Sequence, residues 1–170
     1  MQKTKGLEPR PLRAPVDVRI IKRKVGEEKP YSDEKTRHNC YLLEGMDEMW
    51  NLVCGYGSAV AYNNTNARIG VGNSATAEDE AQTGLIGGST NFQGMKAGYP
   101  KTPGADAMAQ KAVFRSVFAD GQAEFAWEEF TIDNGNTRNK NLVRIVASKG
   151  TKSAGEEWEV EITTPLQNPA

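Results

Sequence analysis

The C-terminal part of this chain alternates between apolar and acidic residues, and this pattern constrains the fold more than any other. Three apolar residues alternate with three glutamates: Trp158, Val160 and Ile162 against Glu157, Glu159 and Glu161. Successive side chains of a strand point to opposite faces of its sheet. The pattern therefore predicts a β-strand with one face on a core and the other facing water or a basic neighbour.

Several more short strand signals precede this one, separated by turn residues. We expect strands near 16–20, 67–72, 112–119, 124–132, 142–148 and 157–163. Turns are expected at Asp120-Gly121, at Asn134-Gly135 and over 150–155. This spacing predicts a mainly β fold, an antiparallel β-sandwich or barrel. Its core should contain Trp127, Trp158, Phe114, Phe118 and Val160.

One amphipathic helix is expected between Asn39, a suitable N-cap, and Gly55, a suitable left-handed ending. Its apolar residues recur at helical spacing: Leu42, Met46, Met49 and Val53, with Trp50 widening the stripe. Gly45 inside the helix costs about 1 kcal/mol relative to Ala, so the helix needs tertiary support. We expect the apolar face to cover one side or end of the sheet. The region 73–111 is predicted to be a long loop, with one helical turn near 77–82.

The charge is distributed unevenly along the 170 residues. Residues 1–39 hold 11 basic and 6 acidic residues, whereas residues 40–170 hold 10 and 16. Pro9, Pro11 and Pro15 disfavour a helix at the N-terminus. We therefore divide the chain into an extended basic arm with a connector, 1–38, and a β domain with a leading helix, 39–170.

The arm is expected to bind a protein partner by adding a strand to it and by ion pairing. The residues predicted to do so are Arg10, Arg13, Val16, Val18, Arg19, Ile20, Lys22, Arg23 and Lys24. Glu157, Glu159 and Glu161 form a candidate acidic interface. A nucleic-acid partner is not favoured, because no aromatic residue for base stacking precedes Tyr31 and the pI is near 5.9.

The sequence contains no recognisable catalytic, cofactor-binding or metal-binding constellation. Cys40 and Cys54 are expected to be reduced thiols, and with His38 as the only histidine they match no zinc spacing. The start, MQKTKGLEPRPLRAP, lacks the apolar segment of a signal peptide, and we expect neither secretion nor a membrane span.

Three short patterns resemble functional sites but lack features that such sites need. Gly70-Val-Gly72-Asn-Ser-Ala75 matches a dinucleotide motif, but no crossover helix follows it, so we expect a bulge or a tight strand exit. The run 78–80 is acidic but lacks the alternating ligands of a calcium loop. Glu128 and Glu129 are adjacent in a predicted strand, so they point to opposite faces and cannot act as a carboxylate pair. One of them is expected to pair with Arg115 or Arg144.

Five segments together resemble a group of small tailed-phage virion proteins. The matching residues are Leu42–Gly55, Ile69-Gly-Val-Gly-Asn-Ser74, Phe114-Arg115 with Phe118, Trp127–Ile132 and Lys152–Trp158. The resemblance covers roughly residues 39–163, and the arm is not part of it. The chain is also similar to the attachment region of phage tail-collar fibres, but has Asn73 in place of an Asp and Thr131 in place of a Gly.

The resemblance and the arm together suggest a non-enzymatic virion structural protein, assembled in the host cytoplasm. We expect a capsid decoration (cement) protein that clasps neighbouring capsid subunits with its arm. Its partners would be the major capsid protein or another virion protein, and further copies of itself in a homo-oligomer, for which we expect a trimer. The alternatives are a tail, collar or fibre-attachment protein and, from another class, a nucleic-acid-binding accessory protein.

Overall fold

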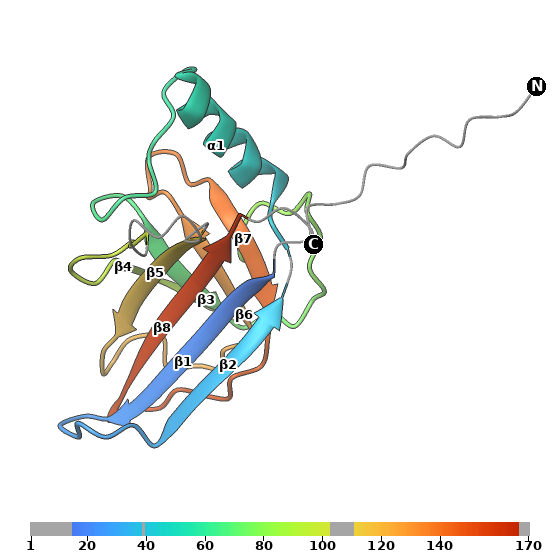
Figure 1. Ribbon diagram of the computed structural model, residues 1–170. Coiled ribbons are helices and arrows are strands. Elements are labelled where there is room, and N and C mark those ends of the chain that lie inside the picture. The colour runs from blue at the N-terminus through green and yellow to red at the C-terminus, as the bar shows by residue number, and fades with distance from the viewer. Residues whose placement is uncertain (1–14, 39, 103–110, 167–170) are drawn as a thin grey trace, which may run out of the picture.

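The computed structural model describes residues 15–38, 40–102 and 111–166. Its elements in chain order are β1 (Val16–Lys24), β2 (Ser32–His38), α1 (Leu43–Cys54), β3 (Arg68–Gly72), β4 (Thr90–Gly94), β5 (Lys111–Phe118), β6 (Glu129–Asp133), β7 (Asn141–Val146) and β8 (Glu156–Pro165). The strands form two four-stranded antiparallel sheets. Sheet A has the order β2-β1-β8-β5 and sheet B the order β4-β3-β6-β7. The sheets pack face to face (Figure 1), so the predicted mainly β, antiparallel fold is confirmed as a sandwich.

The core lies between the two sheets and is centred on Trp127. Its indole ring makes edge-to-face contacts with Trp158 and Phe118, at centroid distances of 4.7 Å and 4.9 Å. The indole N–H donates to the Ala123 carbonyl at 2.9 Å, which satisfies the one polar group of the ring. The predicted core is confirmed, because each of its residues is at most 3% exposed: Trp127, Trp158, Phe114, Phe118 and Val160.

The first strand of the sandwich corrects the predicted domain boundary. β1 lies inside sheet A, where it pairs with β2 on one side and β8 on the other. Residues 16–38 therefore belong to the β domain, and the boundary expected after residue 38 is wrong. The predicted boundary is wrong because the sequence of β2 is strongly charged, as the sequence of a polar connector is. β2 is an edge strand, where alternating charged side chains discourage pairing with another chain.

The described part of the predicted loop 73–111, residues 73–102, is more ordered than predicted. It contains β4, and its residues 76–87 lie over the outer face of sheet B. Arg144 of β7 holds this segment by donating to Gln82 Oε1 at 2.8 Å and to the Thr76 carbonyl at 3.1 Å. Glu129 of β6 accepts from the Gly87 amide at 2.7 Å and from Arg144 Nε at 2.8 Å. The expected pairing of one of the two adjacent glutamates with Arg144 is therefore confirmed.

α1 lies across one end of the sandwich, beside β7 (Figure 1). It begins later than predicted, since its N-cap is Leu42, which has no side-chain capping bond. Gly55 ends it in the left-handed conformation, as expected. Gly45 rests directly on β7: a Cβ at this position would lie 2.5 Å from the Asn141 carbonyl oxygen and closer still to Leu142 Cα. Only glycine allows this approach of the helix to the sheet.

Candidate docking surface at the helix end

The apolar residues predicted to bind a partner through strand addition are part of the core. Val16, Val18 and Ile20 are completely buried in the sandwich. The prediction that they add a strand to a neighbouring protein is wrong, because both edges of β1 are already paired within the chain. Arg10 and Arg13 lie outside the described residues.

The basic residues of β1 also have partners in their own chain. Arg19 donates to Asp33 at 2.8 Å, and Lys24 pairs with Glu156 at 2.6 Å. Lys22 is buried and donates to Glu34 and to the Lys149 carbonyl at 2.8 Å and 2.6 Å. Its ammonium also lies 4.5 Å from the centre of the Trp158 ring. Arg23 donates to the Glu28 carbonyl at 3.4 Å. These side chains hold the hairpin and its neighbouring strand in place.

The candidate acidic interface is largely neutralised by cross-strand partners. Glu157, Glu159 and Glu161 do alternate with the core residues of β8, as predicted. Glu159 pairs with Lys96 at 2.6 Å and with Arg115 at 3.2 Å, and Arg115 also pairs with Glu161. Glu157 lies opposite Arg23 in the β1–β8 register. The expected basic neighbours of this face are therefore on the same chain.

The short patterns that resemble functional sites have structural roles. Gly72 is the last residue of β3, as expected of a strand exit, whereas Gly70 lies within the strand. A Cβ at Gly70 would lie 2.9 Å from Thr131 Cγ2, and one at Gly72 would lie 2.9 Å from Glu129 Cδ. Glu78 accepts from the Val146 amide at 2.7 Å and lies 3.1 Å from His38 Nδ1.

Both cysteines are free thiols, and burial raises the pKa of Cys40. Among the described residues, no group of three or more His, Cys, Asp or Glu side chains is placed to hold a metal ion. No helix in this part of the chain is long and apolar enough to cross a membrane.

α1 presents its most apolar residues to solvent, contrary to the sequence prediction. We call Leu43, Met46, Trp50 and Val53 the helix stripe. Trp50 is 67% exposed and Val53 76% exposed, so the prediction that these two residues cover the sheet is wrong. Leu42 is completely buried, as expected, and Met46 and Met49 are partly buried against the core.

The most deeply buried residues of α1 are small or polar. Gly45 and Glu48 are its buried residues. Glu48 accepts from the Val60 amide at 2.8 Å, from Asn134 Nδ2 at 2.9 Å and from Arg138 at 2.8 Å. The bond from Arg138 is the main reason why the pKa of Glu48 is lowered, although burial opposes it. The helix is therefore attached by a buried carboxylate, a glycine contact and the partly buried Met46 and Met49, which leaves Leu43, Trp50 and Val53 of the helix stripe exposed.

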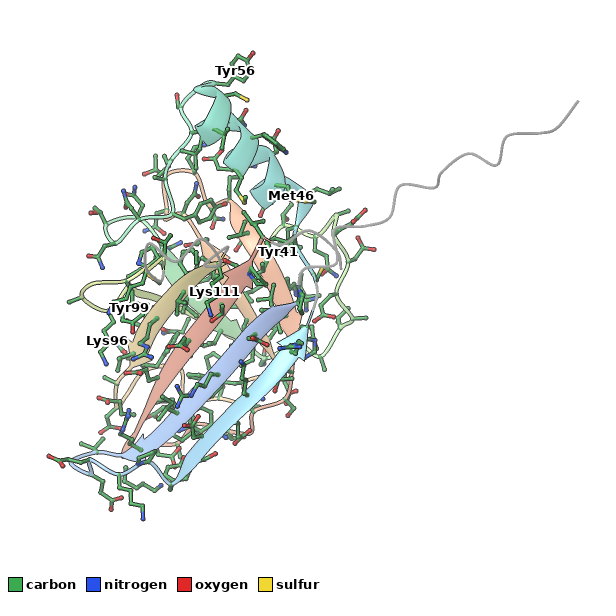
Figure 2. All side chains as sticks on the ribbon, in the orientation of Figure 1. Tyr41, Met46, Tyr56, Lys96, Tyr99 and Lys111 are labelled. Atoms are coloured by element: carbon green, nitrogen blue, oxygen red, sulfur yellow. The ribbon has the colours of Figure 1, made fainter. Side chains whose placement is uncertain are left out.

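An apolar groove of about 640 Å³ adjoins the helix, and we call it the end groove. Its apolar lining includes Tyr41, Met49, Leu52, Phe114, Leu142 and Leu166, and Lys101 and Lys111 lie at its rim. A smaller hollow of about 260 Å³ shares Tyr41, Met49 and Leu166 with it and continues to the helix stripe. In Figure 2, Tyr41 and Met46 lie together at the base of α1, Tyr56 lies at its far end, and Lys111 lies near Tyr41 on β5.

The two phenols of the end groove are occupied by structural hydrogen bonds. The Tyr41 hydroxyl donates to the Pro165 carbonyl at 2.8 Å, and burial raises the pKa of Tyr41 to about 12. The Tyr62 hydroxyl donates to the Lys140 carbonyl at 3.0 Å, and burial raises its pKa as well. Neither phenol is suited to proton transfer near neutral pH. The groove offers apolar contact and a basic rim, which is the chemistry of a binding surface.

Both ends of the described chain lie at this end of the sandwich. Val16 begins β1 beside the end of β8, since Asp17 is paired with Thr163. Leu166, at the other end of the chain, lines the end groove. The N-terminal residues before Val16 are therefore attached close to the helix and the groove.

Comparisons with protein-family models, with curated proteins and with solved structures found no match to this chain.

The helix stripe is the candidate feature that the sequence interpretation missed. The signal was present, because Leu43, Met46, Trp50 and Val53 follow a spacing of three and four residues. The stripe through Leu42, Met46, Met49 and Val53 satisfies the same helical period. Periodicity identifies an amphipathic helix but does not say which apolar face meets the core.

Proposed function

We propose that this chain is a non-enzymatic structural protein of a tailed-phage particle. Within that class we propose a capsid decoration (cement) protein, which binds the major capsid protein or another virion protein and forms a homo-oligomer. The resemblance of residues 39–163 to small virion proteins supports the class of particle.

One observation carries the proposal: the apolar surface at the helix end of the sandwich. Trp50, Val53 and Tyr56 are each at least two-thirds exposed there, next to the end groove. A contiguous exposed apolar patch of this kind is typical of a surface that binds a macromolecule. In the described part of the chain, every buried side-chain nitrogen and oxygen has a hydrogen-bond partner. Contact between proteins explains such a surface better than catalysis does.

The N-terminal residues 1–14 remain as the arm in this proposal. The arm contains Arg10 and Arg13 and can span up to about 50 Å when extended. It is attached next to the helix end, so it can cross to a neighbouring subunit while the sandwich stays in place. The nucleic-acid alternative loses support, because Arg19, Lys22 and Lys24 have acidic partners within the chain.

The test is co-sedimentation with undecorated shells at two salt concentrations. We compare the intact chain with a variant that lacks residues 1–14 and with an Arg10→Glu, Arg13→Glu double variant, with a Lys29→Glu variant as a surface control. We expect the intact chain and the control to sediment with shells and both arm variants to bind weakly. The intact chain should bind less at high salt, since part of the attraction is ionic. Failure of the intact chain to bind shells would contradict the proposal.

A further inference from the structure

The spacing of the helix stripe is that of a helix–helix seam. Leu43, Met46, Trp50 and Val53 lie at i, i+3, i+7 and i+10, which correspond to positions a, d, a and d of a heptad. A strict a/d stripe is narrower than the face by which a helix covers a sheet. A stripe of this width fits against the apolar face of a second amphipathic helix.

The opposite side of α1 already has its partner. Gly45 rests on β7, and Glu48 is bound by Arg138 and Asn134. The seam is additional to these contacts except at Met46, which also packs against the core of its own sandwich. Three of its four residues are substantially exposed: Leu43 at 49%, Trp50 at 67% and Val53 at 76%.

The charges of α1 permit contact with an identical helix. The helix carries three acidic residues, Glu44, Asp47 and Glu48, and no basic residue. Two of them are neutralised from the sandwich, because Glu44 lies 3.6 Å from Lys140 and Glu48 lies 2.8 Å from Arg138. Asp47 alone lacks an ion pair among the described residues, so two copies would bring few like charges together.

We infer that the helix stripe is the surface through which copies of this chain associate, with the α1 seam of one copy packed on the α1 seam of the next. This specifies the homo-oligomer within the proposed function. The occupant is a second copy because the seam is apolar, nearly neutral at its flanks and self-complementary, as a symmetric interface requires. Tyr56 and Leu166, which are also exposed, extend the apolar area beyond the seam.

The area is compatible with a stable interface. A standard interface buries about 800 Å² on each partner, of which about 57% is apolar. The aromatic side chains Trp50 and Tyr56 alone offer on the order of 200–300 Å². Leu43, Val53 and Leu166 add to this, so the helix end can supply most of the apolar share. Trp50, at the centre of the stripe, is expected to contribute the most.

The first test is the mass of the full chain in solution, measured by analytical ultracentrifugation over a range of concentrations. We compare the wild type with Trp50→Glu and Val53→Glu. The matched control is Val25→Glu, because Val25 is 56% exposed in the β1–β2 turn at the opposite end of the molecule (Figure 1). We expect the wild type and the control variant each to form an oligomer. In the two seam variants the dissociation constant of the oligomer should be raised about tenfold or more.

A second readout uses the fluorescence of Trp50. Trp127 and Trp158 are buried, so Trp50 is the one exposed tryptophan of three. Its emission should shift to shorter wavelength as the protein is concentrated, and this shift should be absent in Trp50→Phe. High salt should preserve the shift, since the contact is apolar. Near-ultraviolet circular dichroism of the buried tryptophans confirms that the variants are folded.

Two outcomes would overturn the inference. One is a wild-type chain that is monomeric throughout, which would leave the stripe to a different protein. The other is an oligomer that Trp50→Glu and Val53→Glu leave unchanged. The two proposals fail separately. A monomer that binds shells overturns the seam and the homo-oligomer but leaves the decoration role, whereas a seam oligomer that does not bind shells overturns the decoration role alone.

Discussion

Replacement of Gly45 by alanine tests whether the helix is attached as described. Helix propensity alone predicts that Gly45→Ala stabilises the protein by about 1 kcal/mol. The structure predicts the opposite, because the new Cβ would lie 2.5 Å from the Asn141 carbonyl oxygen. The obstacle is backbone of β7, which cannot rotate away as a side chain can. It is also tied to the helix start, since the Leu42 amide donates to the Leu142 carbonyl at 3.1 Å.

Relief of this clash requires the helix to move outward. Overpacking costs typically 1–3 kcal/mol, and a contact with rigid backbone at 2.5 Å belongs in the upper part of that range, about 2–3 kcal/mol. After the gain of about 1 kcal/mol in propensity, we expect a net loss of about 1–2 kcal/mol. Urea unfolding measures the difference. Gly88→Ala is the control, because no heavy atom lies within 4 Å of a Cβ at that position, and it should cause no loss. A Gly45→Ala protein that is as stable as the wild type, or more stable, would refute the contact.

Three further predictions concern charges and the chain end. Glu129→Gln should lower the unfolding free energy in urea by about 3–5 kcal/mol, because Arg144 is completely buried and would lose its counter-ion; an unchanged midpoint would contradict this. Burial alone would raise the pKa of Glu156, but its hydrogen bonds lower it from 4.5 to about 2. Ionised Glu156 should therefore stabilise the fold by about 3 kcal/mol above pH 4.5, and this contribution should disappear toward pH 2. A Glu156→Gln protein should have a flatter profile of unfolding free energy against pH. Removal of residues 1–14 should leave the thermal unfolding midpoint nearly unchanged, whereas removal of residues 1–24 deletes a central strand and should abolish cooperative unfolding.

The C-terminal half of the fold was predictable because its signals are local. Trp158, Val160 and Ile162 alternate with charged residues, and glycines mark the turns around them. Alternation of period two determines which side chains share a face, whatever the rest of the chain does. The buried set followed from that pattern alone.

The N-terminal half was harder to predict, because the roles of its residues depend on partners that are distant in the sequence. Lys22 and Lys24 form part of a basic cluster in the sequence, yet they pair with Glu34 and Glu156 in the fold. Such pairing across strands cannot be seen in a window of neighbouring residues. The orientation of α1 could not be predicted either, because it depends on the approach of Gly45 to β7.

The proposed decoration role is tested most directly by the number of copies of this chain in purified particles. Quantitative mass spectrometry of separated heads and tails determines that number. A capsid decoration protein should be present in hundreds of copies per particle and remain with the heads. Absence of the chain from particles would contradict the structural role altogether. A few tens of copies or fewer, found with the tails, would contradict the decoration role and favour a collar or fibre-attachment protein.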